Sequence, residues 1–129
     1  MNVLDSLAAL MLLFAGIGGC APEQKELSRQ SSPNQKLAAV LVESMLKDAA
    51  GSVREDIYVS DQGLPPNLGK PVFSAVGCDH VRFEWVNDYT LQIQYETTCV
   101  ISQFTNRWDR PSNIAAGRPN PIEIILIRG

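Results

Sequence analysis

The sequence lacks the residue patterns on which most catalytic and metal sites depend. It has a single histidine, and its three cysteines form no Cys-x-x-Cys pair. It also has no Asp-rich calcium loop, and Gly16, Gly18 and Gly19 lie in an apolar N-terminal stretch rather than in a phosphate-binding loop between a strand and a helix. Metal sites need several His, Cys or carboxylate ligands that converge. We therefore expect no metal site, no cofactor and no catalytic residue.

An excess of charge of one sign is also missing. Eleven basic and fourteen acidic side chains give a net charge of −3. A nucleic-acid-binding domain typically carries a basic patch or stripe, so we expect no nucleic-acid partner. Hydrophobic residues make up 45% of the chain, which is ordinary for a globular domain and too much for a disordered chain.

The histidine, His80, is the one candidate for acid–base chemistry. It adjoins Asp79, and in the hairpin described below it faces Glu96. A His–carboxylate pair can orient a general base, but the local sequence places no serine or cysteine nucleophile beside it. We interpret His80 as a surface residue on a polar strand face, and a hydrolase that uses it is the least favoured function.

The N-terminal segment has the pattern of an export signal. The apolar stretch from Leu7 to Ile17 is about half of the roughly 20 residues that a membrane-spanning helix needs, and it matches the apolar region of a signal peptide. Ile17-Gly18-Gly19-Cys20 resembles the lipobox of bacterial lipoproteins, in which an aliphatic and two small residues precede the cysteine. One departure is that no Lys or Arg precedes Leu7, whereas signal peptides normally open with positive charge. The alternative is a short buried helix in which Cys20 is incidental.

This resemblance implies a lipid anchor. In bacterial lipoproteins a diacylglyceryl group joins the cysteine thiol, the chain is cut before it, and the new amino end is acylated, with palmitate as a typical chain. Several acyl chains give stable anchoring, so the membrane is the expected partner of Cys20. Ala21 is not the Asp that favours inner-membrane retention, which implies the outer membrane, facing the periplasm.

Composition divides the chain into three parts. We expect a lipoprotein signal peptide over residues 1–19, a lipidated, flexible tether over 20–35, and a single β-rich domain over 36–129. The segment from Ala21 to Gln35 is polar, has two prolines and contains one large aliphatic residue, Leu27. Such a segment cannot bury enough apolar surface to offset its ordering entropy.

One hairpin is strongly specified by period-two alternation. Residues 80–86 and 91–96 alternate polar and apolar side chains, with turn-favouring Asn87 and Asp88 between them. A one-residue slip of the pairing would mix the two faces. The register that puts six apolar side chains on one face pairs Trp85 with Leu91, Phe83 with Ile93 and Val81 with Tyr95.

Further strands are expected over 56–60, 71–76, 100–105 and 122–128. The last is the most β-branched run, and we expect it to be central or covered on both faces. Short strands joined by Gly- and Pro-bearing loops predict a mainly β fold, a small antiparallel meander that closes as a sandwich or a partly open barrel.

Residues 37–49 fit two structures. Leu37, Leu41, Met45 and Ala49 form a helical stripe that Gly51 would end. Favouring a strand, Ser32-Pro33-Asn34-Gln35-Lys36 resembles the Ser-Pro-Asp-Gly-Lys turn that opens strands in many β-meander proteins. Together with Ala50-Gly51-Ser52, Trp85 and residues 91–95, this turn resembles a set of small bacterial β-meander proteins with no known activity. We expect a strand over 37–44, with the helix as the alternative.

Cys78 and Cys99 remain once Cys20 is set aside for lipid. An exported protein meets an oxidising compartment, where paired cysteines usually form a disulfide. The hairpin register places Cys78 opposite Thr98, one residue from Cys99, so a small shift would join the sulfurs. We expect a Cys78–Cys99 disulfide, with two buried or reactive thiols as the alternative.

The loop at 106–121 carries the candidate partner-binding residues, Arg107, Trp108 and Arg110. Tryptophan and arginine are enriched in binding hot spots. The alternative is that Trp108 plugs one end of the core while the arginines stay in solvent. We expect a non-enzymatic binding or structural lipoprotein of the cell envelope with an envelope protein as its partner. The runner-up is an inhibitor or immunity lipoprotein against a wall-degrading enzyme, whose cleft this loop would enter.

Overall fold

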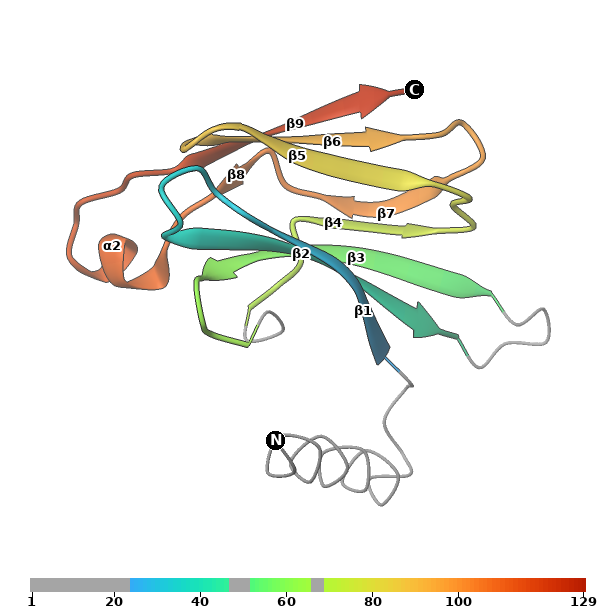
Figure 1. Cartoon of the computed structure of the whole chain (residues 1–129), viewed down its shortest axis with the longest axis horizontal. Helices are drawn as coiled ribbons and strands as arrows, with labels where there is room; N and C mark the ends of the chain where they lie inside the picture. Colours follow the sequence, from blue (N-terminus) through green and yellow to red (C-terminus); the bar gives the residue numbers. More distant parts are fainter. Residues whose placement is uncertain (1–23, 47–51, 66–68) are drawn as a thin grey trace, which may run out of the picture.

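The domain is a sandwich of two β-sheets, as seen in the computed structural model. The model describes residues 24–46, 52–65 and 69–129, so Cys20 and the predicted signal peptide lie outside the described residues. The predicted mainly β fold is confirmed, and the two sheets face each other as separate layers rather than closing into a barrel (Figure 1). No helix within these three ranges is long and apolar enough to cross a membrane.

The first sheet is antiparallel throughout, and the second contains one parallel pair. Their strand orders are β1-β2-β3-β4-β7 and β5-β6-β9-β8. A single short helix, α2 (Pro111–Ala115), follows β8 in the described chain. The strands are β1 (Gln24–Ser31), β2 (Leu37–Met45), β3 (Val53–Asp61), β4 (Phe73–Val76), β5 (Val81–Asn87), β6 (Thr90–Tyr95), β7 (Val100–Phe104), β8 (Arg107–Trp108) and β9 (Ile122–Arg128).

The core lies between the two sheets and is filled by the alternate residues that point inward. Each buried aliphatic or aromatic side chain contributes about 1.5–3 kcal/mol relative to exposure, so this layer is the main source of stability. The first sheet contributes Leu37, Ala39, Leu41, Ile57, Val59, Phe73 and Ala75, and the second contributes Phe83, Leu91, Ile93, Ile122 and Ile124.

The predicted hairpin register is confirmed in β5 and β6. Val81 pairs with Tyr95, and the other two predicted pairs join Phe83 to Ile93 and Trp85 to Leu91. All six side chains belong to the core or pack against it. The prediction held because a single face of this hairpin is apolar, so only one register buries that face.

The preferred strand at 37–44 is also confirmed, since β2 spans Leu37–Met45. Seven of its nine residues are buried, on both faces of the strand. A helix would bury only one stripe of these residues and leave the rest in solvent. The Ser32 turn sets the start of the strand, because the Leu37 backbone N–H donates to Ser32 Oγ at 3.2 Å and Gln35 takes a positive φ of 60°. Residues 47–49 of the alternative helix lie outside the described residues.

The predicted flexible tether is wrong for residues 24–31, which form β1. All eight side chains of β1 are exposed, yet β1 pairs with β2 from Gln24 opposite Ser44 to Ser31 opposite Ala38. The prediction of a tether considered only the apolar area that the side chains could bury. What holds β1 is the backbone ladder to a strand that is itself buried, and the Ser32 turn that folds the chain back. The domain therefore begins at or before Gln24 rather than at residue 36.

The topology is not a simple meander at β9. Strand β9 pairs in parallel with β6, with Leu91 opposite Ile124, and pairs on its other edge with the two residues of β8. It is therefore central in its sheet, as predicted. It is not covered on both faces, because Glu123 is exposed between buried Ile122 and Ile124.

Cys78 and Cys99 form the predicted disulfide. Their Cα atoms lie 4.5 Å apart, and both side chains pack against the core. The bond joins the chain just before β5 to the chain just after β6, so it closes the open end of the hairpin. Gly77, with φ of 77°, supplies the left-handed residue that turns the chain into Cys78.

Removing the disulfide should cost stability without changing the fold. The bond closes a loop with a sequence separation of 21 residues, which corresponds to about 3 kcal/mol in the chain-entropy model. We expect the Cys78→Ala/Cys99→Ala variant to lose about that amount in urea unfolding under non-reducing conditions. Reduced wild type is the matched control and should unfold like the variant. Equal unfolding free energies for the variant and the oxidised protein would contradict the expectation.

Candidate functional site

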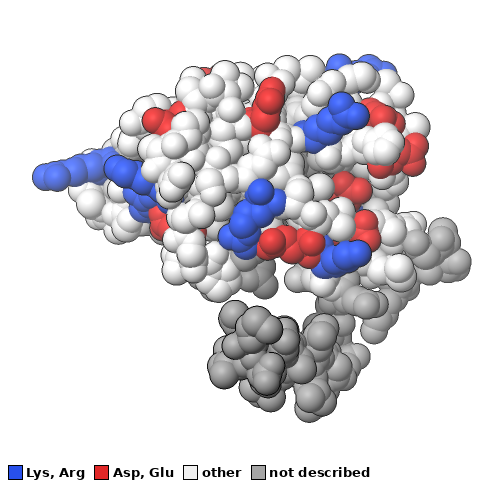
Figure 2. Space-filling view, viewed as in Figure 1, with Lys and Arg blue, Asp and Glu red and all other residues white. Residues whose placement is uncertain are grey.

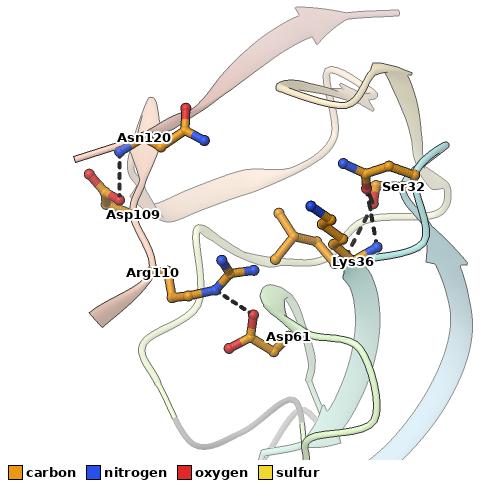
Figure 3. A network of polar contacts seen from close by, with 8 residues as sticks. Ser32, Lys36, Asp61, Asp109, Arg110 and Asn120 are labelled. Atoms are coloured by element: carbon orange, nitrogen blue, oxygen red, sulfur yellow. Dashed lines mark hydrogen bonds and ion pairs between the residues drawn. The ribbon is translucent and has the colours of Figure 1, made fainter. Parts of the chain in front are cut away.

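Several loops meet at the end of the sandwich opposite the disulfide. The Ser32 turn is tied to the β5–β6 turn by the Asn34 N–H, which donates to Asp88 Oδ1 at 2.7 Å. The chain after β3 is tied to the Ser32 turn, since Gln62 N–H donates to the Lys36 carbonyl at 2.9 Å. Figure 3 shows this end from close by, with the loop that follows β8 beside the turn at Ser32 and the end of β3. These cross-links make the loop cluster one connected unit.

A hollow opens in this loop cluster and is called the Trp108 hollow here. Its volume is about 320 Å³, within the usual range of small-molecule sites. Its wall is mainly apolar and is built from Val59, Leu64, Pro65, Gly69, Trp108 and Pro111, with Ser60, Asp61, Arg110 and Ser112 supplying polar groups.

An ion pair fixes the polar side of the hollow. Arg110 Nε lies 2.6 Å from Asp61 Oδ1, and both side chains are about one-third exposed, at 31% and 34%. A pair this exposed is worth only about 0.2–1 kcal/mol, so its role is positional rather than energetic. It ties the loop after β8 to the end of β3. The Nε atom is engaged, and the Nη groups form no other hydrogen bond within the described chain.

Trp108 takes the core-closing position that the sequence left as an alternative, and it also lines the hollow. The indole packs against the core and is only partly buried. The remaining part of the ring lines the hollow. Trp108 therefore closes this end of the core and also offers a flat apolar wall to a ligand.

Arg107 is not part of the same site. Its side chain is 59% exposed, and its Nη2 atom lies 3.6 Å from Asp109 Oδ2. It lines a different hollow, beside Tyr89 and Glu123. Adjacent residues of a strand point to opposite sides, so β8 separates Arg107 from Trp108. The three predicted binding residues thus divide into a Trp108–Arg110 pair and a separate, solvent-exposed arginine.

The sequence did not reveal the β3 side of the hollow. Asp61 is one of several acidic residues scattered along the sequence, and Leu64 and Pro65 belong to a stretch without a recognisable motif. Asp61 and Arg110 are 49 positions apart, and no periodic pattern connects them. The available signal was the pair of long Pro-bearing loops, because two such loops at one end of a sandwich often form a site.

The loop beyond the hollow ends in a protruding tip. No residue of α2 is buried, and every residue from Ile114 to Asn120 is exposed, with Ile114 at 63%. The tip is nevertheless ordered by its own backbone, since Gly117 N–H donates to the Ile114 carbonyl and Arg118 N–H to the Asn113 carbonyl. Figure 1 shows α2 standing out from the end of the two sheets.

His80 lies at the other end of the domain. It is exposed and shares a small hollow of about 160 Å³ with Glu96, as the hairpin register predicts, and with Arg82 and Tyr95. No three His, Cys, Asp or Glu side chains of the described ranges lie close enough together to hold a metal ion. Charges of both signs are interspersed over the face seen in Figure 2, with wide uncharged areas between them.

Near this end, Glu55 is buried on the core side of β3. Its side chain sits among the inward-facing positions, directly opposite Glu43 of β2, and only 7% of the residue is exposed. Burial raises the pKa of the Glu55 carboxyl, the charge of Glu43 raises this pKa further, and His80 lowers it.

Known proteins give no relative for this chain. No protein-family model, curated protein or solved structure matches it.

The raised pKa of Glu55 predicts a pH-dependent stability. The folded protein binds the Glu55 proton more tightly than the unfolded chain does. The stability that this tighter binding contributes is therefore fully present below the unfolded pKa of about 4.3, and it is lost as pH rises through the folded pKa. We expect Glu55→Gln to be more stable than wild type at pH 7 and to lose this advantage toward pH 4, in urea unfolding. Glu123→Gln, at an exposed strand position, controls for the loss of one charge. A stability difference that stays constant over this range would contradict the expectation.

Proposed function

We propose that the protein is a lipid-anchored, non-enzymatic binding module of the bacterial cell envelope that binds its partner in the Trp108 hollow. The observation that carries this proposal is the hollow itself, a concave and mainly apolar space of about 320 Å³ with a few polar groups at its edge. Binding sites for small groups are typically built in this way.

The wall of the hollow indicates the chemistry of the bound group. The exposed part of the Trp108 ring suits an apolar or flat group that packs against it. The Nη groups of Arg110 are donors held in place by the bond from Nε to Asp61, and they suit a carboxylate or another acceptor oxygen. A protein segment or wall fragment that combines an apolar group with a nearby acceptor fits both features.

The position of β1 supports this use of the anchor. The lipobox resemblance puts lipid on Cys20, and the residues from Cys20 to Gln24 reach at most roughly 14 Å when extended. Strand β1 then runs for eight residues, about 26 Å, away from that point. Its far end at Ser31 pairs with Ala38, whose other neighbour Ser60 lines the hollow. An anchored monomer would therefore present the hollow away from the membrane.

A second candidate function is favoured by the protruding tip. An inhibitor or immunity lipoprotein blocks an enzyme by inserting an ordered, convex loop into its cleft. The exposed residues 114–120, with Ile114 at 63% exposure, have that shape and an apolar side chain to insert. A wall-degrading enzyme is the expected target for a protein placed in the periplasm.

Replacing Cys20 tests the anchor. We expect Cys20→Ser to move the protein from the membrane fraction to the soluble or precursor fraction, because the thiol that carries lipid is gone. Fractionation of cells and mass measurement of the mature N-terminus provide the readout. Globomycin, which blocks the lipoprotein signal peptidase, should make the wild type accumulate as precursor. Membrane association that survives both treatments would contradict the anchor.

Filling the hollow tests the binding site. Ser112 is exposed on α2 and lines the hollow, so Ser112→Trp should fill it and reduce recovery of the envelope partner in a pull-down at least about tenfold. Ala115→Trp adds the same side chain to an exposed position of the same helix, outside the hollow, and should leave recovery unchanged. Equal melting temperatures show that both variants fold. Loss with Ala115→Trp alone would instead support the protruding tip as the contact.

A further inference from the structure

Strand β5 has an unpaired edge. It is the first strand of its sheet and pairs with β6 on one side. On the other side no strand of the described chain pairs with it, and the neighbouring β1 reaches it through Trp85 Nε1, which donates to the Gln30 carbonyl at 3.0 Å. Edge strands are commonly protected by Lys, by Pro, by very short length, by a bulge or by a covering segment. Strand β5 has seven residues and contains neither Lys nor Pro, and its register shift and its contact with β1 both lie at its end, at Trp85–Asn87.

A groove runs along this edge. Its volume is about 490 Å³, and it is lined by Ser28 and Gln30 of β1, by Val81 to Glu84 of β5, and by Gln92 and Gln94 of β6. The lining by Gln92 and Gln94 shows that the groove also extends over the outer face of the sheet. An added strand would lie about 4.8 Å from β5 at its open edge. The backbone donors and acceptors of a strand edge are satisfied by another extended backbone, so an extended segment is the occupant that the groove suits.

The charges on β5 favour a second copy of the same strand as the occupant. Arg82 and Glu84 are both exposed, lie two positions apart, and therefore point to the same, outer face of the sheet. When two copies of β5 pair antiparallel about a two-fold axis at Phe83, Arg82 of each copy lies opposite Glu84 of the other. Opposite charges placed directly across a strand pair are stabilising. The edge is therefore complementary to itself, as a two-fold interface requires.

The neighbouring registers are disfavoured. A slip of one residue places inward-facing side chains opposite outward-facing ones. The next registers that keep the faces matched place Arg82 opposite itself, or Glu84 opposite itself, and like charges directly opposite are destabilising. Of these registers, the one centred on Phe83 avoids both conflicts, and it also aligns Val81 with Trp85 on the core side.

We propose that the β5 edge is a homodimer interface, in which a second copy of this chain pairs antiparallel through β5 with Phe83 on the two-fold axis. The β5–β6–β9–β8 sheet then continues across the two copies, and the strand axis of one copy is reversed relative to the other. Both Cys20 anchors then reach one membrane when the strands of the dimer lie along its surface, whereas a monomer stands upright as under the proposed function. The interface consists of a backbone ladder and two cross-strand ion pairs.

Charge reversal tests this interface in the full-length lipidated chain in detergent, with mass followed by sedimentation velocity over a range of concentrations. The wild type should dimerise. Arg82→Glu and Glu84→Arg, each alone, place like charges across the axis and should each weaken dimerisation about tenfold or more. The double variant Arg82→Glu/Glu84→Arg restores opposite charges and should dimerise like the wild type.

A mixture of the two single variants gives the sharpest outcome. The Arg82→Glu chain carries two acidic residues at these positions and the Glu84→Arg chain two basic ones, so the two variants should form a heterodimer although each is monomeric alone. This result also shows that both variants are folded. A wild type that stays monomeric at every concentration, or a dimer that charge reversal leaves unchanged, would overturn the proposal. A monomeric wild type that captures an extended peptide at this groove would assign the edge to another protein and would also overturn it.

Discussion

The constraint on which the domain depends is the burial of β2 on both of its faces. A strand that is closed to water on both faces must have its backbone N–H and C=O groups paired along both edges, because an unpaired buried polar group costs about as much as a lost hydrogen bond. Strand β3 satisfies one edge and β1 satisfies the other. The polar strand β1 is thus required by its neighbour, although it buries no side chain of its own. The turn at Ser32 and the start of the domain follow from that requirement.

This dependence explains which parts of the fold could be predicted from the sequence. The β5–β6 register was predictable because one apolar face, read with period two, permits a single pairing. Strand β1 could not be predicted in this way. It forms because β2 has backbone groups to pair, and the composition of β1 carries no sign of that. The parallel pairing of β6 with β9 could not be predicted either, because alternation indicates that a segment is a strand but not which strand it pairs with. The same limit applies to the site: Trp108 and Arg110 were candidates by residue type, whereas Asp61 joins them only through the fold.

The two ends of the sandwich have different characters. One end is closed by the Cys78–Cys99 bond and contains the buried carboxyl of Glu55, whose pKa burial raises. The other gathers three loops that hydrogen bonds and one ion pair hold together, leaving a hollow beside Trp108. Under the proposed function, stability and recognition are separated along the strand axis. Changes in the loops would then alter binding without reaching the residues that hold the sheets together.

The direction in which β1 runs also determines how the domain would bear force. With the chain held at Cys20 and a partner bound at the Trp108 hollow, tension acts along the strand axis, because Gln24 and Ser31 mark opposite ends of β1. Such tension loads the hydrogen bonds between β1 and β2 together, in shear, rather than opening them one after another like a zipper. A strand that has no buried side chain is thus placed where its ladder would resist extraction best. Under the proposed anchoring, β1 is the strand that joins the domain to its lipid.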